Sequence, residues 1–216
     1  MHALNQYIDQ TLLRPDATEK EIMQFVEDVE RFQFYAAVVN PCWVEYVRQN
    51  LPAEIKVCSV VGFPLGATSS EVKICAAGDL VKMGCDEIDM VMNIGRFRSG
   101  DHKYVGKEIK MVVDAAKGRV VKVIIETCLL TTDEKKAAAC IIKENGAHFV
   151  KTSTGFAKAG AQLDDVRMLR QIVGRDYGVK ASGGIRDYRS ALEFIRAGAN
   201  RIGTSSGKAI MEEITR

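Results

Sequence analysis

Four charged side chains interrupt segments that otherwise have the apolar, β-branched composition of buried strands. Asp89 stands within EIDMVMN, Lys122 within VVKVIIE, Lys151 at the end of AHFVK and Lys180 within GVKAS. A charge in a strand that is covered on both faces costs free energy unless it is paired or used in chemistry. These charges therefore either pair with one another as structural ion pairs or reach a catalytic face.

Lys151 and Lys180 lie near the C-terminal ends of consecutive predicted strands. If those strands are neighbours, the two amines stand a few ångströms apart, and at least one should have a lowered pKa and be a free amine near neutral pH. A free amine attacks a carbonyl to form a Schiff base, whose iminium stabilises a carbanion without an external cofactor. Asp89 would neutralise the second ammonium and carry protons through an ordered water.

Two glycine-rich segments follow the last two predicted strands: SGGIR at Ser182–Arg186 and GTSSG at Gly203–Gly207. Glycine lets main-chain N–H groups approach phosphate oxygens closely, and the hydroxyls of the second segment can donate further hydrogen bonds. A third segment, KTSTG at Lys151–Gly155, connects a candidate nucleophile to its loop. Each segment alone could be a turn or a helix cap, but together they predict a small phosphorylated metabolite as ligand.

Eight short strand-like segments alternate with longer segments of helical period, which predicts βα units and a parallel sheet. They are Tyr7–Asp9, Tyr35–Val39, Lys56–Val61, Glu87–Met92, Val120–Glu126, Ala147–Lys151, Gly178–Ser182 and Ala199–Gly203. Eight such repeats predict an α/β fold, a (β/α)8 TIM barrel, as one domain over residues 1–216. A doubly wound open sheet is the alternative, although no G-x-G-x-x-G turn follows the first strand.

Local signals mark where the helices begin and end. Thr18–Glu21 and Thr131–Glu134 fit the capping box, which satisfies free N–H groups at a helix N-terminus. Glycines that end a helical pattern and favour a left-handed backbone stand at Gly84, Gly118, Gly146, Gly174 and Gly198.

The composition is that of an ordinary globular protein and argues against several classes of partner. Thirty basic and 28 acidic side chains give a net charge of +2, too small for the broad positive field of a nucleic-acid-binding protein. No window approaches the roughly 18 apolar residues of a membrane span, and the N-terminus lacks a secretory leader pattern. The six cysteines form no C-x-x-C pair and the three histidines are far apart, so we expect no metal, reduced core cysteines and a cytoplasmic protein.

Seven segments spread along the whole chain resemble the deoxyribose-phosphate aldolases, which are class I (Schiff-base) aldolases on a (β/α)8 barrel. The segments are IDQTLLRPDAT (Ile8–Thr18), VVGFPLGA (Val60–Ala67), EIDMVMNIG (Glu87–Gly95), VKVIIET (Val121–Thr127), FVKTSTGF (Phe149–Phe156), VKASGGIR (Val179–Arg186) and RIGTSSG (Arg201–Gly207). FVKTSTGF and VKASGGIR together are highly specific, whereas SGGIR alone also suits phosphosugar isomerases.

The resemblance implies reversible cleavage of 2-deoxy-D-ribose 5-phosphate to acetaldehyde and D-glyceraldehyde 3-phosphate, without a cofactor, in deoxyribonucleoside catabolism. It makes Lys151 the Schiff-base lysine, Lys180 the neighbour that lowers its pKa and joins proton transfer, and Asp89 the acid/base partner. It also implies a homo-oligomer, either a dimer or a tetramer.

The same resemblance assigns the remaining contacts to substrate. The phosphate site would be lined by Gly155, Gly183, Gly184, Ser205 and Ser206, and supporting contacts to substrate or water would come from Thr154, Asp9 and Lys122. The chain departs from the family at Gln10, where members often have His, and at Ala157–Gly160, where their loop is richer in Gly and Pro. Both departures lie near the predicted mouth and concern substrate preference and loop mobility more than reaction class.

Two other functions compatible with these segments stay open. Another phosphosugar barrel enzyme, such as an isomerase or a different Schiff-base aldolase, would use the same phosphate loops. A catalytically silent sugar-phosphate-binding protein would bind the ligand without forming an imine, although buried charges without chemistry cost several kcal/mol.

Overall fold

Eight parallel strands follow one another around a closed barrel in chain order, and β8 closes the ring by pairing with β1. The computed structural model describes residues 4–215. The strands are β1 (Ile8–Leu12), β2 (Ala36–Val39), β3 (Lys56–Val61), β4 (Glu87–Val91), β5 (Val120–Ile124), β6 (Phe149–Lys151), β7 (Gly178–Ser182) and β8 (Arg201–Thr204). The predicted TIM barrel is therefore confirmed, and the doubly wound alternative is excluded.

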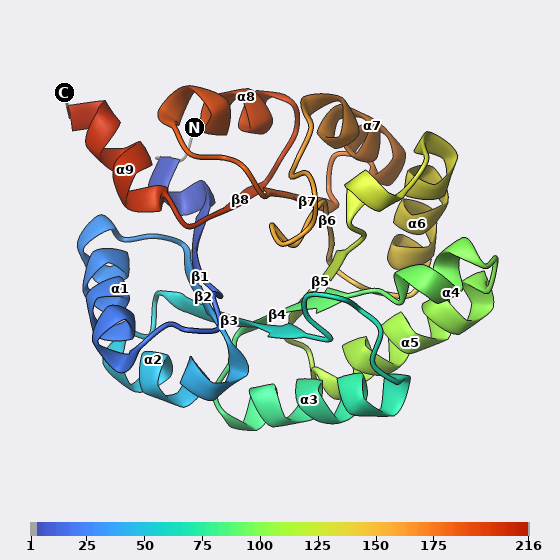
Figure 1. Ribbon diagram of the computed structural model, residues 1–216, viewed down its shortest axis with the longest axis horizontal. Coiled ribbons are helices and arrows are strands. Elements are labelled where there is room, and N and C mark those ends of the chain that lie inside the picture. Colours follow the sequence, from blue (N-terminus) through green and yellow to red (C-terminus); the bar gives the residue numbers. More distant parts are fainter. Residues whose placement is uncertain (1–3, 216) are drawn as a thin grey trace.

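The α-helices form a ring around the barrel, and Figure 1 shows them following the strands in chain order. They are α1 (Glu19–Phe32), α2 (Val44–Asn50), α3 (Ser70–Lys82), α4 (Ile94–Arg98), α5 (His102–Ala115), α6 (Thr132–Glu144), α7 (Leu163–Val173), α8 (Tyr188–Arg196) and α9 (Gly207–Glu212). Short 3-10 helices occur at Leu4–Tyr7, Pro41–Trp43, Thr127–Leu129 and Glu213–Thr215. In residues 4–215 no helix has the length and apolar character needed to cross a membrane.

The helix boundaries follow the local signals in the sequence. The backbone N–H groups of Thr18 and Thr131 donate to the carboxylates of Glu21 and Glu134 at 2.8 and 2.7 Å, so both predicted capping boxes form. All five glycines expected at helix ends have positive φ, a backbone conformation that glycine adopts without steric cost: Gly84, Gly118, Gly146, Gly174 and Gly198.

Alternate residues along each strand face opposite sides of the sheet, and the two sides differ in polarity. The residues that face the helices belong to one continuous apolar core, and they include Ile8, Val57, Ile88, Val121, Val150, Val179 and Ile202. The charged residues occupy the alternating positions of the same strands, as at Asp9, Asp89, Lys122 and Lys180. The apolar layer outside the sheet therefore holds the barrel together, while the interior of the barrel carries charge.

Only β3 and β7 match the predicted ranges at both ends, and the other six strands differ by one to three residues at an end. The differences in β1 and β5 have a clear physical reason. β1 continues to Leu12 because Gln10, Thr11 and Leu12 pair with β2, although the first two residues are polar. β5 ends at Ile124, two residues before the prediction, because the chain turns at Glu126, which has a left-handed backbone (φ 51°).

The cysteines were expected to be core residues, and for most of them this was wrong. All six are free, but only Cys58 and Cys85 are buried, while Cys128 is partly buried and three are exposed: Cys42, Cys75 and Cys140. Cys75 and Cys140 lie on α3 and α6, where the apolar composition of the segment does not decide which face of the helix a small side chain occupies.

A buried ion pair outside the barrel interior fixes the loop between β3 and α3. Nζ of Lys73 on α3 donates to the Glu108 carboxylate on α5 at 2.9 Å and to the carbonyl oxygens of Gly66 and Val91 at 2.8 and 2.9 Å. Glu108 also accepts a hydrogen bond from the Ser70 hydroxyl at 3.1 Å. One lysine thus connects two helices, the β3–α3 loop and the end of β4.

Lys73→Met should lower the free energy of unfolding by about 3–5 kcal/mol, because it leaves the Glu108 charge buried and without its partner. Urea denaturation followed by circular dichroism measures the loss. Lys82→Met is the matched control: it breaks the exposed Lys82–Asp79 pair, for which we expect a loss of about 1 kcal/mol or less. Equal losses in the two variants would contradict a stabilising role for the buried pair.

Candidate active site

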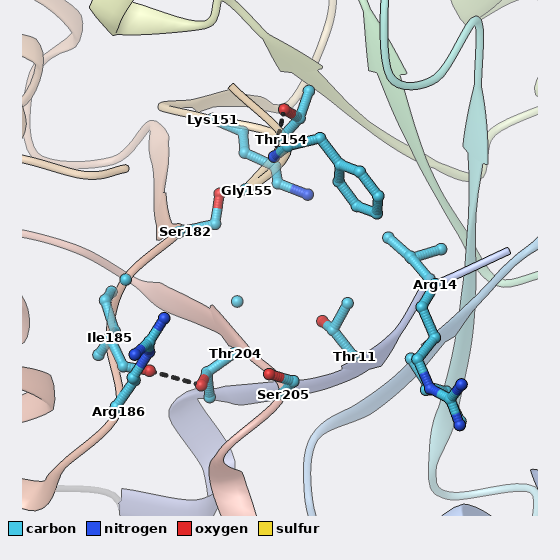
Figure 2. Close-up of a pocket in the computed structure, with 16 residues that line it drawn as sticks. Thr11, Arg14, Lys151, Thr154, Gly155, Ser182, Ile185, Arg186, Thr204 and Ser205 are labelled. Carbon is cyan, nitrogen blue, oxygen red and sulfur yellow. Dashed lines mark hydrogen bonds between the residues drawn. The ribbon is translucent and has the colours of Figure 1, made fainter. Parts of the chain in front are cut away.

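A pocket opens at the C-terminal ends of β1, β6, β7 and β8, the end of a (β/α)8 barrel at which active sites form. It encloses about 290 Å³, which suits a small metabolite. Figure 2 shows Lys151, Thr154 and Ser182 on one side of the pocket, with Thr204 and Ser205 across from them. Leu12, Leu13, Arg14 and Phe156 complete the lining on the β1 side and at the mouth.

Lys151 is the last residue of β6 and lines the pocket although it is only 3% exposed. Lys180 lies beside it on β7, since the two residues are register partners in neighbouring strands. Both ammonium nitrogens contact the same oxygen, Oδ2 of Asp89, at 2.7 and 2.8 Å. The strands that carry the two lysines are therefore neighbours, as the sequence predicted, and Asp89 lies between the two amines.

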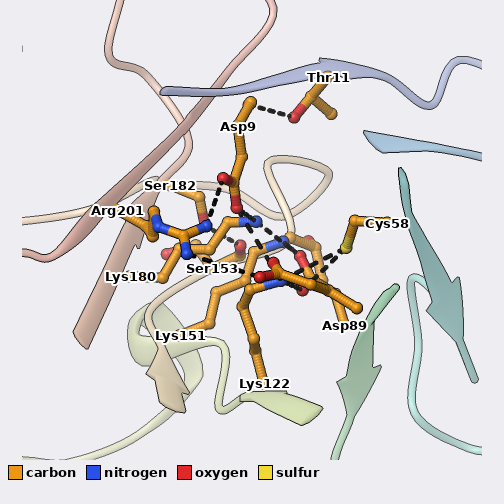
Figure 3. A network of polar contacts seen from close by, with 12 residues as sticks. Asp9, Thr11, Cys58, Asp89, Lys122, Lys151, Ser153, Lys180, Ser182 and Arg201 are labelled. Carbon is orange, nitrogen blue, oxygen red and sulfur yellow. Dashed lines mark hydrogen bonds and ion pairs between the residues drawn. The ribbon is translucent and has the colours of Figure 1, made fainter. Parts of the chain in front are cut away.

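Three carboxylates and three cations alternate around a closed circuit inside the barrel, shown in Figure 3. In order around the circuit, the members are Asp89, Lys180, Asp9, Arg201, Glu87 and Lys122, and Lys122 returns to Asp89. The successive N–O distances are 2.8, 2.5, 3.1, 3.5, 2.6 and 2.8 Å. No side chain of the circuit is more than 10% exposed. Six buried charges of alternating sign therefore neutralise one another in pairs.

Lys151 adds a fourth cation to this balanced circuit, so its positive charge is in excess. Burial lowers the pKa of Lys151 and the charge of Lys180 lowers it further, while Asp89 opposes the shift only in part. Burial acts on Lys180 and Lys122 in the same direction, but their carboxylate partners outweigh it and hold both pKa values above the ordinary range. Lys151 is therefore the member that gives up its proton most readily.

Asp89 stays ionised at the centre of the cluster. Burial alone would raise its pKa, but the charges of Lys122, Lys151 and Lys180 hold it well below the ordinary value. The thiol of Cys58 on β3 also contacts Asp89, with Sγ 3.3 Å from Oδ1, and burial raises the pKa of this thiol well above its usual range. Cys58 is thus a neutral hydrogen-bond donor to the carboxylate. Nothing in the sequence indicates this role except the place of Cys58 in a predicted strand.

The residues predicted to contact the substrate or its phosphate divide into those that line the pocket and those that do not. Thr154, Gly155, Gly183, Gly184 and Ser205 line the pocket. Ser206 does not line it, and its backbone N–H donates to the Thr204 hydroxyl at 2.9 Å.

Asp9 and Lys122 lie in the charge circuit within the barrel and do not line the pocket. Asp9 contacts Lys180 and Lys122 contacts Asp89, so neither residue is placed to contact a molecule in the pocket. Within the described part of the chain, no group of three His, Cys, Asp or Glu residues is arranged to hold a metal ion.

Besides Cys58 and the circuit members Glu87 and Arg201, two further residues at the site had not been singled out from the sequence. Arg186 lines the pocket beside Gly184, and the signal that could have found it was a cation immediately after the glycine pair. Glu126 accepts hydrogen bonds from both the backbone N–H of Thr154, at 3.2 Å, and the Thr154 hydroxyl. Burial raises the pKa of Glu126. This carboxyl group fixes the turn that follows Lys151.

The sequence profile of the family described as "DeoC/LacD family aldolase" matches residues 4–213. The chain belongs to this family of aldolases. It is 50% identical over 210 residues to the deoxyribose-phosphate aldolase of Streptococcus sanguinis, covering 97% of this chain and 96% of that protein. Membership of the DeoC/LacD family makes the protein an aldolase, a carbon–carbon lyase.

Solved aldolase structures share the whole fold. One described as "QR15, an Aldolase" superposes with a TM-score of 0.96 at 43% identity, covering 100% of this chain and 97% of the other. The deoxyribose phosphate aldolase from Aeropyrum pernix, described as having a unique tetrameric structure, superposes with a TM-score of 0.90 at 35% identity, covering 98% of this chain and 91% of the other.

Lys180→Met should move the pH dependence of imine formation on Lys151 toward alkaline pH by about one unit or more. The substitution removes a positive charge that lowers the pKa of Lys151, so a larger share of the amine stays protonated near neutral pH. The rate of reductive trapping with acetaldehyde and cyanoborohydride, measured across pH, reports this shift. Lys208→Met, which breaks an ion pair with Asp28 outside the pocket lining, is the control. An unchanged pH midpoint in Lys180→Met would show that Lys180 does not set the protonation of Lys151.

Proposed function

We propose that the protein reversibly cleaves 2-deoxy-D-ribose 5-phosphate to acetaldehyde and D-glyceraldehyde 3-phosphate through a Schiff base on Lys151. The observation that carries the proposal is the single excess cation at the floor of the pocket. Lys151 reaches the pocket, has a lowered pKa and is held by the carboxylate that it shares with Lys180. Curated relatives about 50% identical to the chain are deoxyribose-phosphate aldolases, which supports this substrate.

The reaction requires a free amine at its first step. The Lys151 amine attacks C1 of the open-chain sugar, and loss of water from the carbinolamine gives an iminium. Removal of the proton on the C3 hydroxyl breaks the C2–C3 bond, and its electron pair moves into an enamine while C3 becomes the aldehyde of glyceraldehyde 3-phosphate. Protonation of the enamine at C2 and hydrolysis of the resulting iminium release acetaldehyde and regenerate Lys151.

The neighbours of Lys151 divide the handling of protons between them. Lys180 has a pKa above the ordinary value, so it stays an ammonium group, and its place next to Lys151 lets it exchange protons with the reacting amine rather than with the substrate directly. Asp89 accepts hydrogen bonds from both amines and has a strongly lowered pKa, so it remains a carboxylate and holds the two amines side by side. Asp9 and Lys122 contribute by completing the charge balance around this pair.

The opposite side of the pocket suits the phosphate of the substrate. Gly183 and Gly184 both have positive φ and bring main-chain atoms to the pocket surface without side chains. The hydroxyl of Ser205 can donate a hydrogen bond there, and Arg186 supplies a positive charge. The Thr154 hydroxyl already donates to Glu126, so Thr154 shapes this part of the pocket through its turn. This end of the site lies in the loops after β6, β7 and β8, away from the buried circuit.

Assembly and location belong to the same proposal. We expect a homo-oligomer, which is supported by the tetramer of the Aeropyrum pernix enzyme. The six free thiols fit a reducing compartment, which supports a cytoplasmic location.

Incubation with acetaldehyde and borohydride should attach an ethyl group to Lys151 and to no other lysine, because only this amine both lines the pocket and has a lowered pKa. Peptide mapping by mass spectrometry locates the adduct. The Lys151→Met variant should remain unlabelled. An adduct on Lys180 in that variant would show that the second amine can replace the first. Binding of sugar phosphates without any adduct would point instead to an isomerase or to a silent binding protein.

Ser205→Asp should raise KM for 2-deoxy-D-ribose 5-phosphate by about tenfold or more, because a carboxylate at the pocket surface repels the phosphate dianion. The loss should be smaller for unphosphorylated 2-deoxy-D-ribose. Ser206→Asp adds the same charge one residue further along but outside the pocket lining, so its effect should be weaker. Steady-state kinetics with both sugars measure the difference, and a stronger effect at Ser206 would place the phosphate elsewhere.

A further inference from the structure

Gln10 is a buried polar residue on the side of β1 that faces away from the charge circuit. It is only 6% exposed and alternates along the strand with Asp9 and Thr11. Its register partner on β8 is Thr204, the last residue before the predicted phosphate loop. A buried carboxamide requires hydrogen-bond partners for both its oxygen and its NH2 group.

Both ends of the Gln10 amide bind the backbone of the loop that follows β8. Its Oε1 accepts from the Gly207 N–H at 3.0 Å, and its Nε2 donates to the Ser205 carbonyl oxygen at 3.3 Å. The approach is close, since a Cβ atom on Gly207 would stand 2.4 Å from this Oε1. Glycine at position 207 is thus what allows the amide to reach the loop.

The same loop is held from its other side by Thr204. The Thr204 hydroxyl donates to the Ile185 carbonyl oxygen at 2.6 Å and accepts from the Ser206 N–H at 2.9 Å. Figure 2 shows the bond between Thr204 and Ile185 at the edge of the pocket, beside Ser205. Hydrogen bonds thus fix the backbone on both sides of Ser205, and the exposed Ser205 remains at the pocket surface.

We propose that Gln10 is a positioning residue for phosphate recognition: its amide fixes the Ser205–Gly207 turn from behind so that Ser205 presents its polar groups to the phosphate. The inference rests on the proposed phosphate end of the site. It requires a side chain with one donor and one acceptor, because the loop offers one carbonyl oxygen and one N–H group. A carboxylate would satisfy Gly207 but would face the Ser205 carbonyl with a second acceptor, and an aliphatic side chain would satisfy neither.

The role is separable from the chemical step. The Gln10 side chain bonds to the loop after β8, whereas Lys151 is held by Asp89 on β4. Loss of the Gln10 hydrogen bonds should therefore act on substrates that carry a phosphate and act much less on imine formation with acetaldehyde.

The test compares Gln10→Glu and Gln10→Leu with Gln6→Leu. Gln6 is the control because its amide also donates to a backbone carbonyl, that of Gln33 at 2.8 Å, but it lies in the 3-10 helix before β1, at the opposite end of the strand from the pocket loops. Steady-state kinetics are measured with 2-deoxy-D-ribose 5-phosphate and with 2-deoxy-D-ribose, and inorganic phosphate serves as a competitive inhibitor.

Both Gln10 variants should raise KM for the phosphorylated sugar and Ki for inorganic phosphate by about tenfold, the size expected when a buried hydrogen-bonded pair is broken. We expect kcat to change by about twofold or less, and the loss of kcat/KM with the unphosphorylated sugar to be about fivefold smaller. Gln6→Leu should change neither KM nor Ki. Gln10→Glu keeps the acceptor for the Gly207 N–H and so decides the question if Gln10→Leu does not fold.

Equal losses with both sugars would overturn the inference, because they would show a general structural effect. Unchanged KM and Ki in Gln10→Glu would overturn it as well. The proposed function fails in a different way: the wild-type protein would form no adduct with acetaldehyde and borohydride, or would show no preference for the phosphorylated sugar. A wild type that prefers the phosphorylated sugar, with Gln10 variants that keep the full preference, rejects the role of Gln10 alone.

Discussion

The need to neutralise charge inside a closed sheet is the constraint on which the site depends. Three carboxylates and three cations from β1, β4, β5, β7 and β8 satisfy one another in a circuit of short contacts. The attraction within each pair offsets part of the free energy lost by removing its two charges from water. It does so only if the strands keep their register, because a slip by one residue would turn the charged side chains toward the apolar helices. The strand register, the closure of the barrel and the balance of buried charge therefore depend on one another. Lys151 is the one buried cation of this cluster that lies outside the balanced circuit.

The outer layers of the barrel provide the stiffness that this interior needs. Helix-facing residues such as Val57, Val121 and Val179 pack into one apolar core, which fixes the faces of the strands. Lys73 stabilises the β3–α3 loop. Its three hydrogen bonds connect α3 with Glu108 on α5, with Gly66 in the loop and with Val91 at the end of β4. Asp89 lies on β4 two residues before Val91, so this connection also limits the movement of the strand that carries it.

Chemistry and recognition occupy different parts of the same barrel. The reacting amine and its partners lie within strands β4, β6 and β7, where hydrogen bonds of the sheet fix the backbone. The groups suited to phosphate lie in the loops after β6, β7 and β8, and the contacts of Glu126, Thr204 and Gln10 hold these loops in place. A substrate with a carbonyl at one end and a phosphate at the other fits this division.

The sequence by itself determined the repeating units and the chemistry of the strands. The alternation of short apolar, β-branched segments with segments of helical period, together with glycines at helix ends, predicted eight βα units, with the bounds of β3 and β7 correct. The lysines in consecutive strands indicated a pair of neighbouring amines. These features are local or depend only on strand order, so they can be seen in a linear chain. Only the tertiary structure decided that Arg201 and Glu87 complete the charge circuit and that Ser205 faces the pocket while Ser206 does not. Barrel closure brings β8 beside β1, and loop hydrogen bonds select which hydroxyl faces inward; both depend on contacts between residues far apart in sequence, which no local pattern encodes.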